Sequence, residues 1–306
     1  MASIREVAKL AHVAPSTVSR ALNGSGYVSE KSKNKIKKAV EELDYIPNQW
    51  IRNLYKKRTG IIGVMTPDII HPYFSTLWNY LEAELDQYGY NVVICNTRGN
   101  QDKEREYLDT LERNLFDGLI VGSAFLSDEY YMNIEKPIIS LDRIIPGIPL
   151  VTSDHHQGGI LAGELFLEKG CKKVMCFSDP TRMELASADS ARALIDVMEK
   201  HNREVIIESC MKRTRTLLDQ YPDVDGIMAL DLCAAAFLKT EKNKKILAYD
   251  GTYATDFNYH SIDSIVQDAK KVAKESVNML IKLINDQPLK KREVLVPVKY
   301  KKGDTL

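Results

Sequence analysis

Three features are absent from this sequence, and each absence excludes a class of protein. No apolar run approaches the roughly 20 residues that a membrane-spanning helix needs, and residues 1–10 lack the apolar stretch of a secretory signal. The five cysteines are scattered, mostly in apolar runs, and none has zinc-site spacing. These absences predict a cytoplasmic protein with reduced core thiols and no bound metal.

The motifs of common enzyme classes are also missing. No glycine-rich phosphate loop of the Walker or dinucleotide type occurs, and no serine or cysteine lies in a recognisable nucleophile elbow. His155 and His156 are adjacent, so their side chains point in different directions, and three nearby metal ligands are not evident. We interpret this histidine pair as part of a turn, and we expect neither catalysis nor a cofactor.

Charge is distributed unevenly along the 306 residues, although the formal net charge is zero. Residues 1–58 contain twelve Lys and Arg against five Asp and Glu, a formal charge of +7, which leaves −7 for the remainder. The length exceeds that of one ordinary core, so two or three domains are expected. A small basic head on an acidic body is typical of a module that binds a polyanion such as nucleic acid.

The head has the pattern of a helix-turn-helix. Apolar residues recur at helical spacing from residue 4, with Ser3 as N-cap and Glu6 completing a capping box. Pro15 begins a second short helix with an outward polar face, and Ser29 caps a third helix over residues 30–43 that carries five lysines. The second helix is predicted to enter the DNA major groove, where Arg20 has the geometry to bond guanine.

Four linked motifs in the head resemble the LacI/GalR (lactose-repressor type) family of bacterial transcriptional regulators. They are IREVA at 4–8, STVSRALN at 16–23, GYVS at 26–29 and YIPN at 45–48, in the family's order and spacing. The resemblance implies operator binding by a homodimer, on a pseudo-palindromic site. The DNA-binding residues expected are Ser3, Pro15, Ser16, Thr17, Ser19, Arg20, Asn23, Tyr45, Asn48, Ile51 and Leu54.

The resemblance also implies a hinge helix and linker at residues 47–59. Leu54 matches the leucine that wedges into the minor groove in such repressors, where the contacts to bent DNA offset a few kcal/mol of unstacking. The family usually has a small residue three positions earlier, whereas this chain has Ile51 after Trp50. An ordinary apolar linker role for Leu54 is the alternative interpretation.

From Gly60 the pattern becomes alternating strands and helices, which predicts doubly wound α/β folding. Ligands of such sheets bind beyond the carboxyl ends of the strands. Asp68, Asp142, Asp154, Asp231 and Asp250 each follow a predicted strand. Carboxylates accept hydrogen bonds from sugar hydroxyls, and Tyr73 or Phe74 is suited to stacking on a sugar face. For each aspartate, a helix N-cap or turn is the alternative.

The body resembles the same family from end to end. The matching motifs are PDIIHPYF at 67–74, LDR at 141–143, VTSD at 151–154, YDG at 249–251 and IVQD at 265–268. The fold class expected is therefore an N-terminal all-α helix-turn-helix head plus an α/β periplasmic-binding-protein-like body of two doubly wound Rossmann-like subdomains. The head would span 1–46, the first subdomain 60–153 plus about 268–290, and the second 154–267 plus about 291–306, with crossings near 154, 267 and 291.

The resemblance implies a sugar or sugar-phosphate effector between the subdomains. The effector-binding residues expected are Asp68, Tyr73, Phe74, Asp142, Arg143, Asp154, Ser190, Arg192, Asp231, Asp250 and Gln267. Ser190 stands where the family has an arginine, with Arg182 or Arg192 as substitutes, and the loop between Glu208 and Thr214 looks short. The effector would then be larger than a monosaccharide, phosphorylated, or replaced by a protein co-regulator.

These observations together predict a repressor of a carbohydrate-utilisation operon under allosteric control. A cytosolic sugar-binding protein is the alternative from another class, since it would share the body's fold. The basic head argues against that alternative. The C-terminus has no heptad tail, so we expect a dimer rather than a tail-mediated tetramer.

Overall fold

The computed structural model describes residues 2–23, 26–45, 58–122, 125–178, 185–208, 218–241, 243–256 and 261–306. It divides into two compact units, Met1–Thr59 and Gly60–Leu306. This boundary is at the point where the basic head gives way to the acidic body in the sequence. Within the described ranges, no helix is long and apolar enough to cross a membrane.

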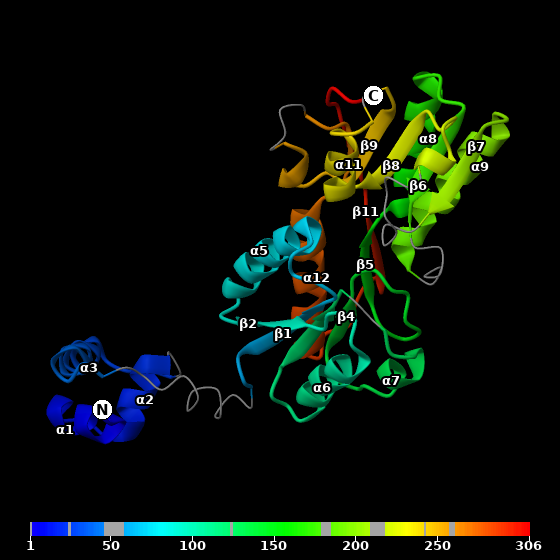
Figure 1. The fold of residues 1–306 in the computed structure, drawn as a ribbon. Helices are drawn as coiled ribbons and strands as arrows, with labels where there is room; N and C mark the ends of the chain where they lie inside the picture. The colour runs from blue at the N-terminus through cyan, green and yellow to red at the C-terminus, as the bar shows by residue number, and fades with distance from the viewer. Residues whose placement is uncertain are drawn as a thin grey trace. The chain divides into compact units, whose positions relative to one another are not determined.

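In the described part of the head, three helices pack around an apolar core of their own. Figure 1 shows these helices. They are α1 (Ile4–Ala11), α2 (Pro15–Asn23) and α3 (Glu30–Glu42). The Ser3–Glu6 capping box begins α1, and Ser29 caps α3, both as predicted. The core consists of the fully buried Val7, Ala8, Ala11, Val18, Ile36 and Ala39. Short helices are marginal alone, so this shared core stabilises the unit.

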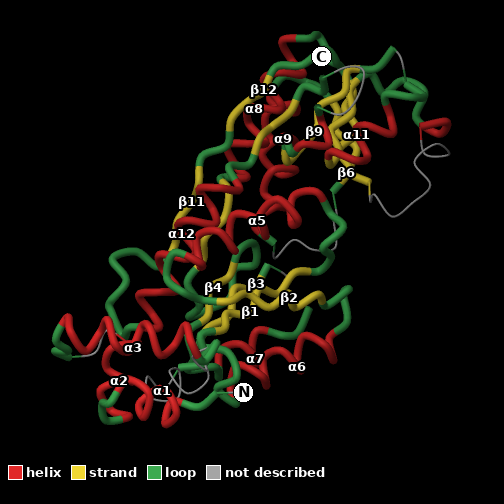
Figure 2. The backbone as a smooth tube through the Cα atoms, turned by 90° about the vertical axis from the view of Figure 1, so that its left-hand side faces the viewer, coloured by secondary structure: helices red, strands yellow, loops and turns green. Residues whose placement is uncertain are grey.

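The first subdomain of the body is a parallel sheet covered by helices on both faces. Its strand order is β11-β5-β4-β3-β1-β2. The strands are β1 (Ile61–Thr66), β2 (Asn91–Asn96), β3 (Gly118–Val121), β4 (Ile138–Ser140), β5 (Leu150–Ser153) and β11 (Glu293–Val296). Figure 2 shows α5 (Pro72–Asp86) and α12 (Ala269–Ile284) on one face, and α6 (Gln101–Glu112) and α7 (Asp128–Met132) on the other.

The second subdomain repeats this plan with one antiparallel edge strand. Its order is β12-β10-β9-β8-β6-β7, and β12 runs antiparallel to β10. The strands are β6 (Lys173–Phe177), β7 (Glu204–Glu208), β8 (Gly226–Leu230), β9 (Lys245–Asp250), β10 (Ser264–Val266) and β12 (Lys299–Lys301). Helices α8 (His155–Glu168) and α9 (Asp189–Lys200) share an apolar core with one face. The short α11 (Asp231–Phe237) packs on the other face.

Three chain segments connect the two subdomains, and one differs from its predicted place. The chain passes from β5 to α8 at Asp154 and from β10 to α12 at Asp268. The third crossing was expected near residue 291, but β11 pairs in parallel with β5, so this crossing lies between Val296 and Lys299. The prediction was wrong here because β11 is a half-exposed edge strand without the continuous apolar run of a central strand.

Close packing of α8 against α9 depends on glycine. A Cβ placed on Gly159 would lie 2.1 Å from the carbonyl oxygen of Ser190, and one on Gly163 would lie 2.6 Å from Val197 Cγ1. Both distances are far below van der Waals contact, so only glycine allows the two backbones to approach this closely. The position of Ser190 is therefore fixed by helix packing.

Candidate functional site

A pocket of about 170 Å³ lies where strands of both subdomains end. We call it the strand-end cleft. Its described lining residues are His71, Tyr73, Phe74, Leu77, Gly122, Leu141, Asp142, Thr152, His155, Ser187, Leu230, Asp250 and Gln267. Gly122 follows β3, Asp142 follows β4, and Asp250 ends β9. Carboxyl ends of parallel strands meet at one edge of each sheet, so the two edges face each other here.

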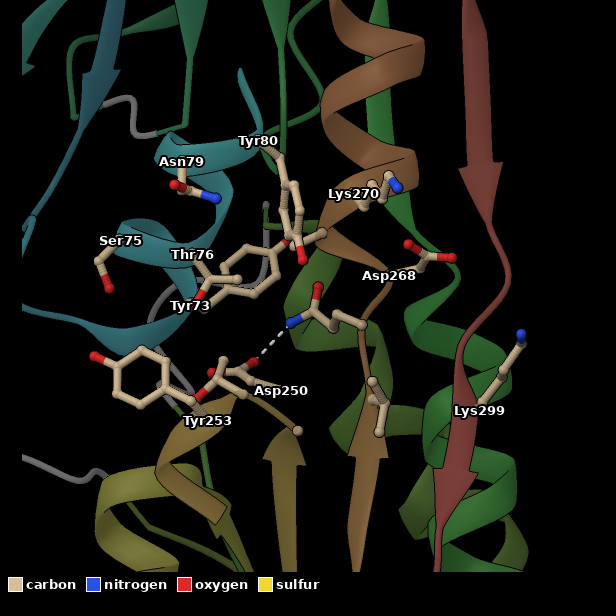
Figure 3. A pocket seen from close by; sticks show the side chains of 15 residues that line it. Tyr73, Ser75, Thr76, Asn79, Tyr80, Asp250, Tyr253, Asp268, Lys270 and Lys299 are labelled. Carbon is tan, nitrogen blue, oxygen red and sulfur yellow. Dashed lines mark hydrogen bonds between the residues drawn. The ribbon is translucent and has the colours of Figure 1, made fainter. Parts of the chain in front are cut away.

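A second, larger pocket of about 760 Å³ shares Tyr73, Asp250 and Gln267 with this cleft. Figure 3 shows it between α5, the start of α12 and the loop after β9, with Lys270 and Lys299 on its wall. We call it the flank pocket. Asp250 is one of only a few strand-end residues in it, and helix and crossover residues form most of its lining. The strand-end cleft is therefore the better candidate for an effector site.

Asp250 is held tightly at the edge of the cleft. Its side chain is buried, its backbone has φ of +112°, and its Oδ1 accepts a 2.6 Å hydrogen bond from Gln267 Nε2 (Figure 3). Its Oδ2 is buried without a hydrogen-bond partner. Burial, with the nearby charge of Asp231, raises the pKa of Asp250 well above its usual range. An unpartnered buried carboxyl oxygen is costly, so Oδ2 has unused hydrogen-bonding capacity in the cleft.

Asp231 was predicted to bind the effector, but its carboxylate holds the loop after β9. Oδ1 accepts from the Gly251 N–H at 3.0 Å, and Oδ2 accepts from the N–H and hydroxyl of Thr252, each at 2.6 Å. Its side chain is buried, and it is not among the residues that line either pocket. These bonds fix the turn that directly follows Asp250, so Asp231 acts on the site by positioning.

Asp142 and His155 meet across the cleft. Asp142 accepts hydrogen bonds from the backbone N–H and the hydroxyl of Ser187, at 2.8 and 2.9 Å. His155 Nε2 lies 3.9 Å from Asp142 Oδ1, and its Nδ1 lies 2.9 Å from the Tyr249 hydroxyl. Burial lowers the pKa of His155, although Asp142 opposes that shift. The ring is therefore neutral near pH 7 and can both donate and accept.

His71 forms a matching arrangement on the opposite side. It directly precedes α5, and its Nε2 lies 3.9 Å from the unpartnered Oδ2 of Asp250. Its Nδ1 is also buried without a hydrogen-bond partner, and burial lowers the pKa of His71. Sequence reasoning missed both cleft histidines, and it interpreted His155 as part of a turn. The available signal was position, because each follows the end of a first-subdomain strand.

Five of the predicted effector residues line the cleft, and the structure places the others elsewhere. Those that line it are Tyr73, Phe74, Asp142, Asp250 and Gln267. Asp68 is exposed and accepts from the Ile70 N–H, and Asp154 caps α8 through the Gln157 N–H. The turn and helix-cap alternatives describe these two aspartates, so their strand-end positions were misleading.

The arginines predicted for the cleft are engaged outside it. Arg143 donates to the Leu126 carbonyl at 2.9 Å and pairs with Asp128, which ties the β4 end to α7. Arg192 Nε donates to Asp189 Oδ1 at 3.0 Å on the half-exposed side of α9. Arg182, the other proposed substitute, lies outside the described residues.

Ser190 does not line the cleft either. Its hydroxyl donates to the Ser187 carbonyl at 2.8 Å, within the turn that presents Ser187 to Asp142. Its side chain is buried against α8. Because residue 190 is a serine, this position supplies no guanidinium group to the cleft. The Asp142 carboxylate accepts its hydrogen bonds from Ser187 instead.

The head presents a polar face on α2. Pro15, Ser16 and Arg20 are exposed, Thr17 and Ser19 are half-buried, and Val18 packs into the core. Ser3 is occupied by its capping box, and Tyr45 packs partly against the core. The Asn23 side chain, Asn48, Ile51 and Leu54 lie outside what the structure describes. The five lysines of α3 are exposed beside this unit's buried Ile36 and Ala39.

Two family matches cover most of the chain. Residues 3–48 match "Bacterial regulatory proteins, lacI family", and residues 59–236 match "Periplasmic binding proteins and sugar binding domain of LacI family". The chain belongs to the LacI family. The fold class and the family expected from the sequence are thus confirmed.

Full-length relatives of this LacI-family chain are operon repressors. The chain is 34% identical to a sucrose operon repressor of Streptococcus mutans, over all of both proteins. It is 34% identical to a ribose operon repressor of Halalkalibacterium halodurans, over 98% of this chain and 95% of that protein. Both relatives are named as repressors of sugar operons and not as enzymes.

Solved structures of the family share the fold. A lac repressor dimer bound to operator matches 99% of this chain and 98% of its own, with 22% identity and a TM-score of 0.85. A regulator from Alkaliphilus metalliredigens complexed with D-xylulofuranose matches 80% of this chain and 98% of its own, with 25% identity and a TM-score of 0.73. Among the described residues of this chain, no cluster of His, Cys, Asp and Glu is arranged to hold a metal ion.

Proposed function

We propose that this LacI-family chain represses a carbohydrate-utilisation operon and that a sugar in the strand-end cleft changes its affinity for operator DNA. The observation that carries the proposal is the pair of carboxylates, Asp142 and Asp250, that line one cavity from the two subdomains. Asp250 Oδ2 and His71 Nδ1 are buried there without hydrogen-bond partners. A sugar supplies several hydroxyl donors and acceptors at once, which would satisfy both atoms.

The apolar part of the cleft suits a sugar ring. Tyr73 and Phe74 both line the cavity, with ring centroids 5.8 Å apart in an edge-to-face arrangement. Aromatic faces pack against the C–H faces of sugars, while nearby polar groups fix the orientation. The sugar-bound regulator from A. metalliredigens and the sucrose and ribose operon repressors support this ligand class for the present chain.

The cleft is placed to act allosterically because residues of both subdomains line it. A ligand that bonds Asp142 of the first subdomain and Asp250 of the second binds most tightly at one separation of the two. That difference in affinity between two arrangements is what shifts their populations. The three connecting segments would serve as the hinge between these arrangements.

The head supplies the DNA contacts. The formal charge of +7 over residues 1–58 provides phosphate binding, and the exposed polar face of α2 provides base contacts, with Arg20 suited to guanine. Operator DNA is cytoplasmic in bacteria, so the proposed action places the protein in the cytoplasm.

We infer that the protein acts as a homodimer on a pseudo-palindromic operator. Strand β2 is a sheet edge, and its Val93 and Ile94 are 38% and 51% exposed. Apolar edge strands are usually covered, and a second copy would cover this one. The operator-bound lac repressor dimer supports the same assembly.

The experiment that tests the proposal is fluorescence anisotropy of the full chain on a pseudo-palindromic operator at fixed salt. Neutral sugars and sugar phosphates are titrated in turn. We expect one neutral sugar to change operator affinity at least tenfold, the effect of about 1.4 kcal/mol of coupling. Operator binding that no sugar changes would favour a co-regulated repressor, and sugar binding without operator binding would favour a cytosolic sugar-binding protein.

A further inference from the structure

Two histidine–aspartate pairs lie across the strand-end cleft, and in each pair the two residues come from different subdomains. His71 comes from the first subdomain and faces Asp250 of the second, whereas Asp142 comes from the first and faces His155 of the second. In each pair the imidazole Nε2 is 3.9 Å from the nearest carboxylate oxygen. All four residues line the same cavity.

The separation in each pair suits one intervening hydroxyl group. A direct hydrogen bond needs about 2.7–3.2 Å, so the pairs do not bond directly at 3.9 Å. A hydroxyl oxygen placed beside the gap can lie about 2.8 Å from both atoms. It then accepts from the imidazole N–H and donates to the carboxyl group, which uses a hydroxyl both as acceptor and as donor.

The neighbours of His155, Tyr249 and Asp142, favour an imidazole ring that carries its proton on Nε2. Burial raises the pKa of Tyr249 well above its ordinary value, so its phenol keeps its proton and can donate to His155 Nδ1. The ring proton then sits on Nε2, which faces Asp142 Oδ1. An oxygen that can both accept and donate completes this chain, and an oxygen that only accepts does not.

Among the residues described, the cleft offers no positively charged side chain to an anionic ligand. Asp142 and Asp250 line it, and its described lining contains no lysine or arginine. A phosphate oxygen bound between a histidine and a carboxylate would add negative charge beside an acid and would lack the hydrogen to donate. Arg143 and Arg192, the guanidinium groups predicted for this site, bond Asp128 and Asp189 instead.

We propose that the effector is an uncharged polyol of monosaccharide size, and that His71 and His155 select it over its phosphate esters by sharing two of its hydroxyl groups with Asp250 and Asp142. This inference rests on the proposed function and names the ligand class of the same site. The cavity of about 170 Å³ lies below the roughly 300–1,000 Å³ of drug-sized sites, which favours a single sugar ring.

The test compares neutral sugars with their phosphates on the full-length chain by isothermal titration calorimetry. The probes are D-ribose with D-ribose 5-phosphate, and D-fructose with D-fructose 6-phosphate. The variants are H71L and H155L, which remove the ring nitrogens, and H71Q and H155Q, which keep a donor and an acceptor. H156Q is the matched control, because His156 is 57% exposed and faces Asp189 outside the cleft.

We expect at least one neutral sugar to bind ten or more times tighter than its phosphate. H71L should weaken that binding at least tenfold, H71Q should restore most of it, and H156Q should match the parent protein. His155 is more deeply buried, so operator affinity without sugar checks that its variants are folded. Because His71 is 29% exposed, its variants test the proposal even where H155L does not fold.

Two results would overturn the inference in distinguishable ways. If a phosphate binds as tightly as the parent sugar and still shifts operator affinity, the proposed function stands and the selection for neutral sugars is wrong. Loss of that phosphate binding in K270A or K299A would then locate it in the flank pocket, whose wall carries these lysines. If no probe binds or shifts operator affinity, the proposed sugar control fails and this inference fails with it.

Discussion

Three buried or half-buried aspartates illustrate how surroundings assign different roles to one side chain. The Asp231 carboxylate receives three hydrogen bonds from its own loop, which leaves it a structural residue. Asp142 receives two from Ser187 and faces the cleft. Asp250 receives one from Gln267 and keeps an unpartnered oxygen there. At the residue scale, ligand binding is therefore expected where hydrogen-bonding capacity remains unused.

The first prediction concerns the unused oxygen of Asp250. Asp250→Asn preserves the shape of the side chain but replaces one carboxyl oxygen with an NH2 group, which cannot accept a hydrogen bond from a ligand hydroxyl. Sugar affinity should fall at least tenfold, while operator affinity without sugar stays within twofold. Calorimetry and operator anisotropy measure the two quantities. Unchanged sugar affinity would place the ligand away from Asp250.

The second prediction concerns pH and His155. Burial lowers the folded-state pKa of this ring below its usual 6.5, so the unfolded chain takes up a proton first as the pH falls. Its stabilising contribution is complete above pH 6.5 and is lost as the pH falls from there toward the folded-state pKa, by at most about 1.4 kcal/mol per pH unit.

Comparison with His155→Gln isolates this contribution, because Asp250, whose pKa is raised, contributes in the opposite direction in both proteins. Urea unfolding of the two proteins between pH 7.5 and 5 measures the difference. The parent should lose more free energy of unfolding on acidification than the variant. Parallel curves would contradict a neutral, buried imidazole.

At the scale of elements, packing of α8 on α9 positions the second-subdomain side of the cleft. His155 begins α8, and the turn before α9 carries Ser187, the partner of Asp142. The two helices approach closely because Gly159 and Gly163 face α9 without side chains. A change at this contact should therefore disturb both stability and the cleft.

The third prediction follows from that contact. Gly159→Ala adds a Cβ 2.1 Å from the Ser190 carbonyl oxygen, so the helices must separate. Overpacking of this kind costs about 1–3 kcal/mol in free energy of unfolding, which outweighs the helical preference for alanine. Chemical denaturation measures it, with the exposed Glu164→Ala on the same helix as control. A stability equal to that of the control would show that α8 and α9 accommodate a side chain at this contact without cost.

The fourth prediction concerns α2 of the head. Arg20→Ala should cost about 1–3 kcal/mol of operator affinity and should relax discrimination at one base pair in each half-site, since a bidentate contact to guanine is lost. Lys35→Ala on α3 is the comparison, because a phosphate contact should weaken binding uniformly across sequences. Anisotropy on a set of single-base operator variants separates the two. A uniform loss in Arg20→Ala would identify Arg20 as a phosphate contact.

At the scale of the whole molecule, charge and ligand binding are divided between two units. Met1–Thr59 and Gly60–Leu306 each have their own apolar core. The basic charge lies in the first unit and a formal charge of −7 in the rest. An acidic body repels DNA electrostatically, so DNA recognition depends on the heads.

The fifth prediction tests this division. A chain of residues 60–306 should bind sugar with the parent affinity and should lose operator binding at least a hundredfold, because the charge and the α2 surface are removed. Calorimetry and anisotropy measure both. For the full chain, log affinity for operator should fall steeply with log salt concentration, by about 0.9 per phosphate contact. Specific operator binding by residues 60–306 would overturn the division into units.

Local pattern was enough to predict the elements and the fold class. The capping box at Ser3, the proline at position 15 and the apolar run of β1 each act within a few neighbouring residues, so the sequence displays them directly. The linked motifs of the head identified the family for the same reason. The strand-end rule also selected Asp142 and Asp250 correctly as residues that line the cleft.

Tertiary structure decided which strand-end groups share the cavity. Asp68, Asp154 and Asp231 also follow strands, but each carboxylate is used by nearby backbone N–H groups, and that competition depends on loop geometry. His71 and His155 belong to the site because two separate sheets bring their edges together. By itself the sequence determined the head, the body and the family, since these depend on local periodicity and order. Only the folded chain determined the cleft, because the approach of residues such as His71 and Asp250 depends on how the two subdomains pack.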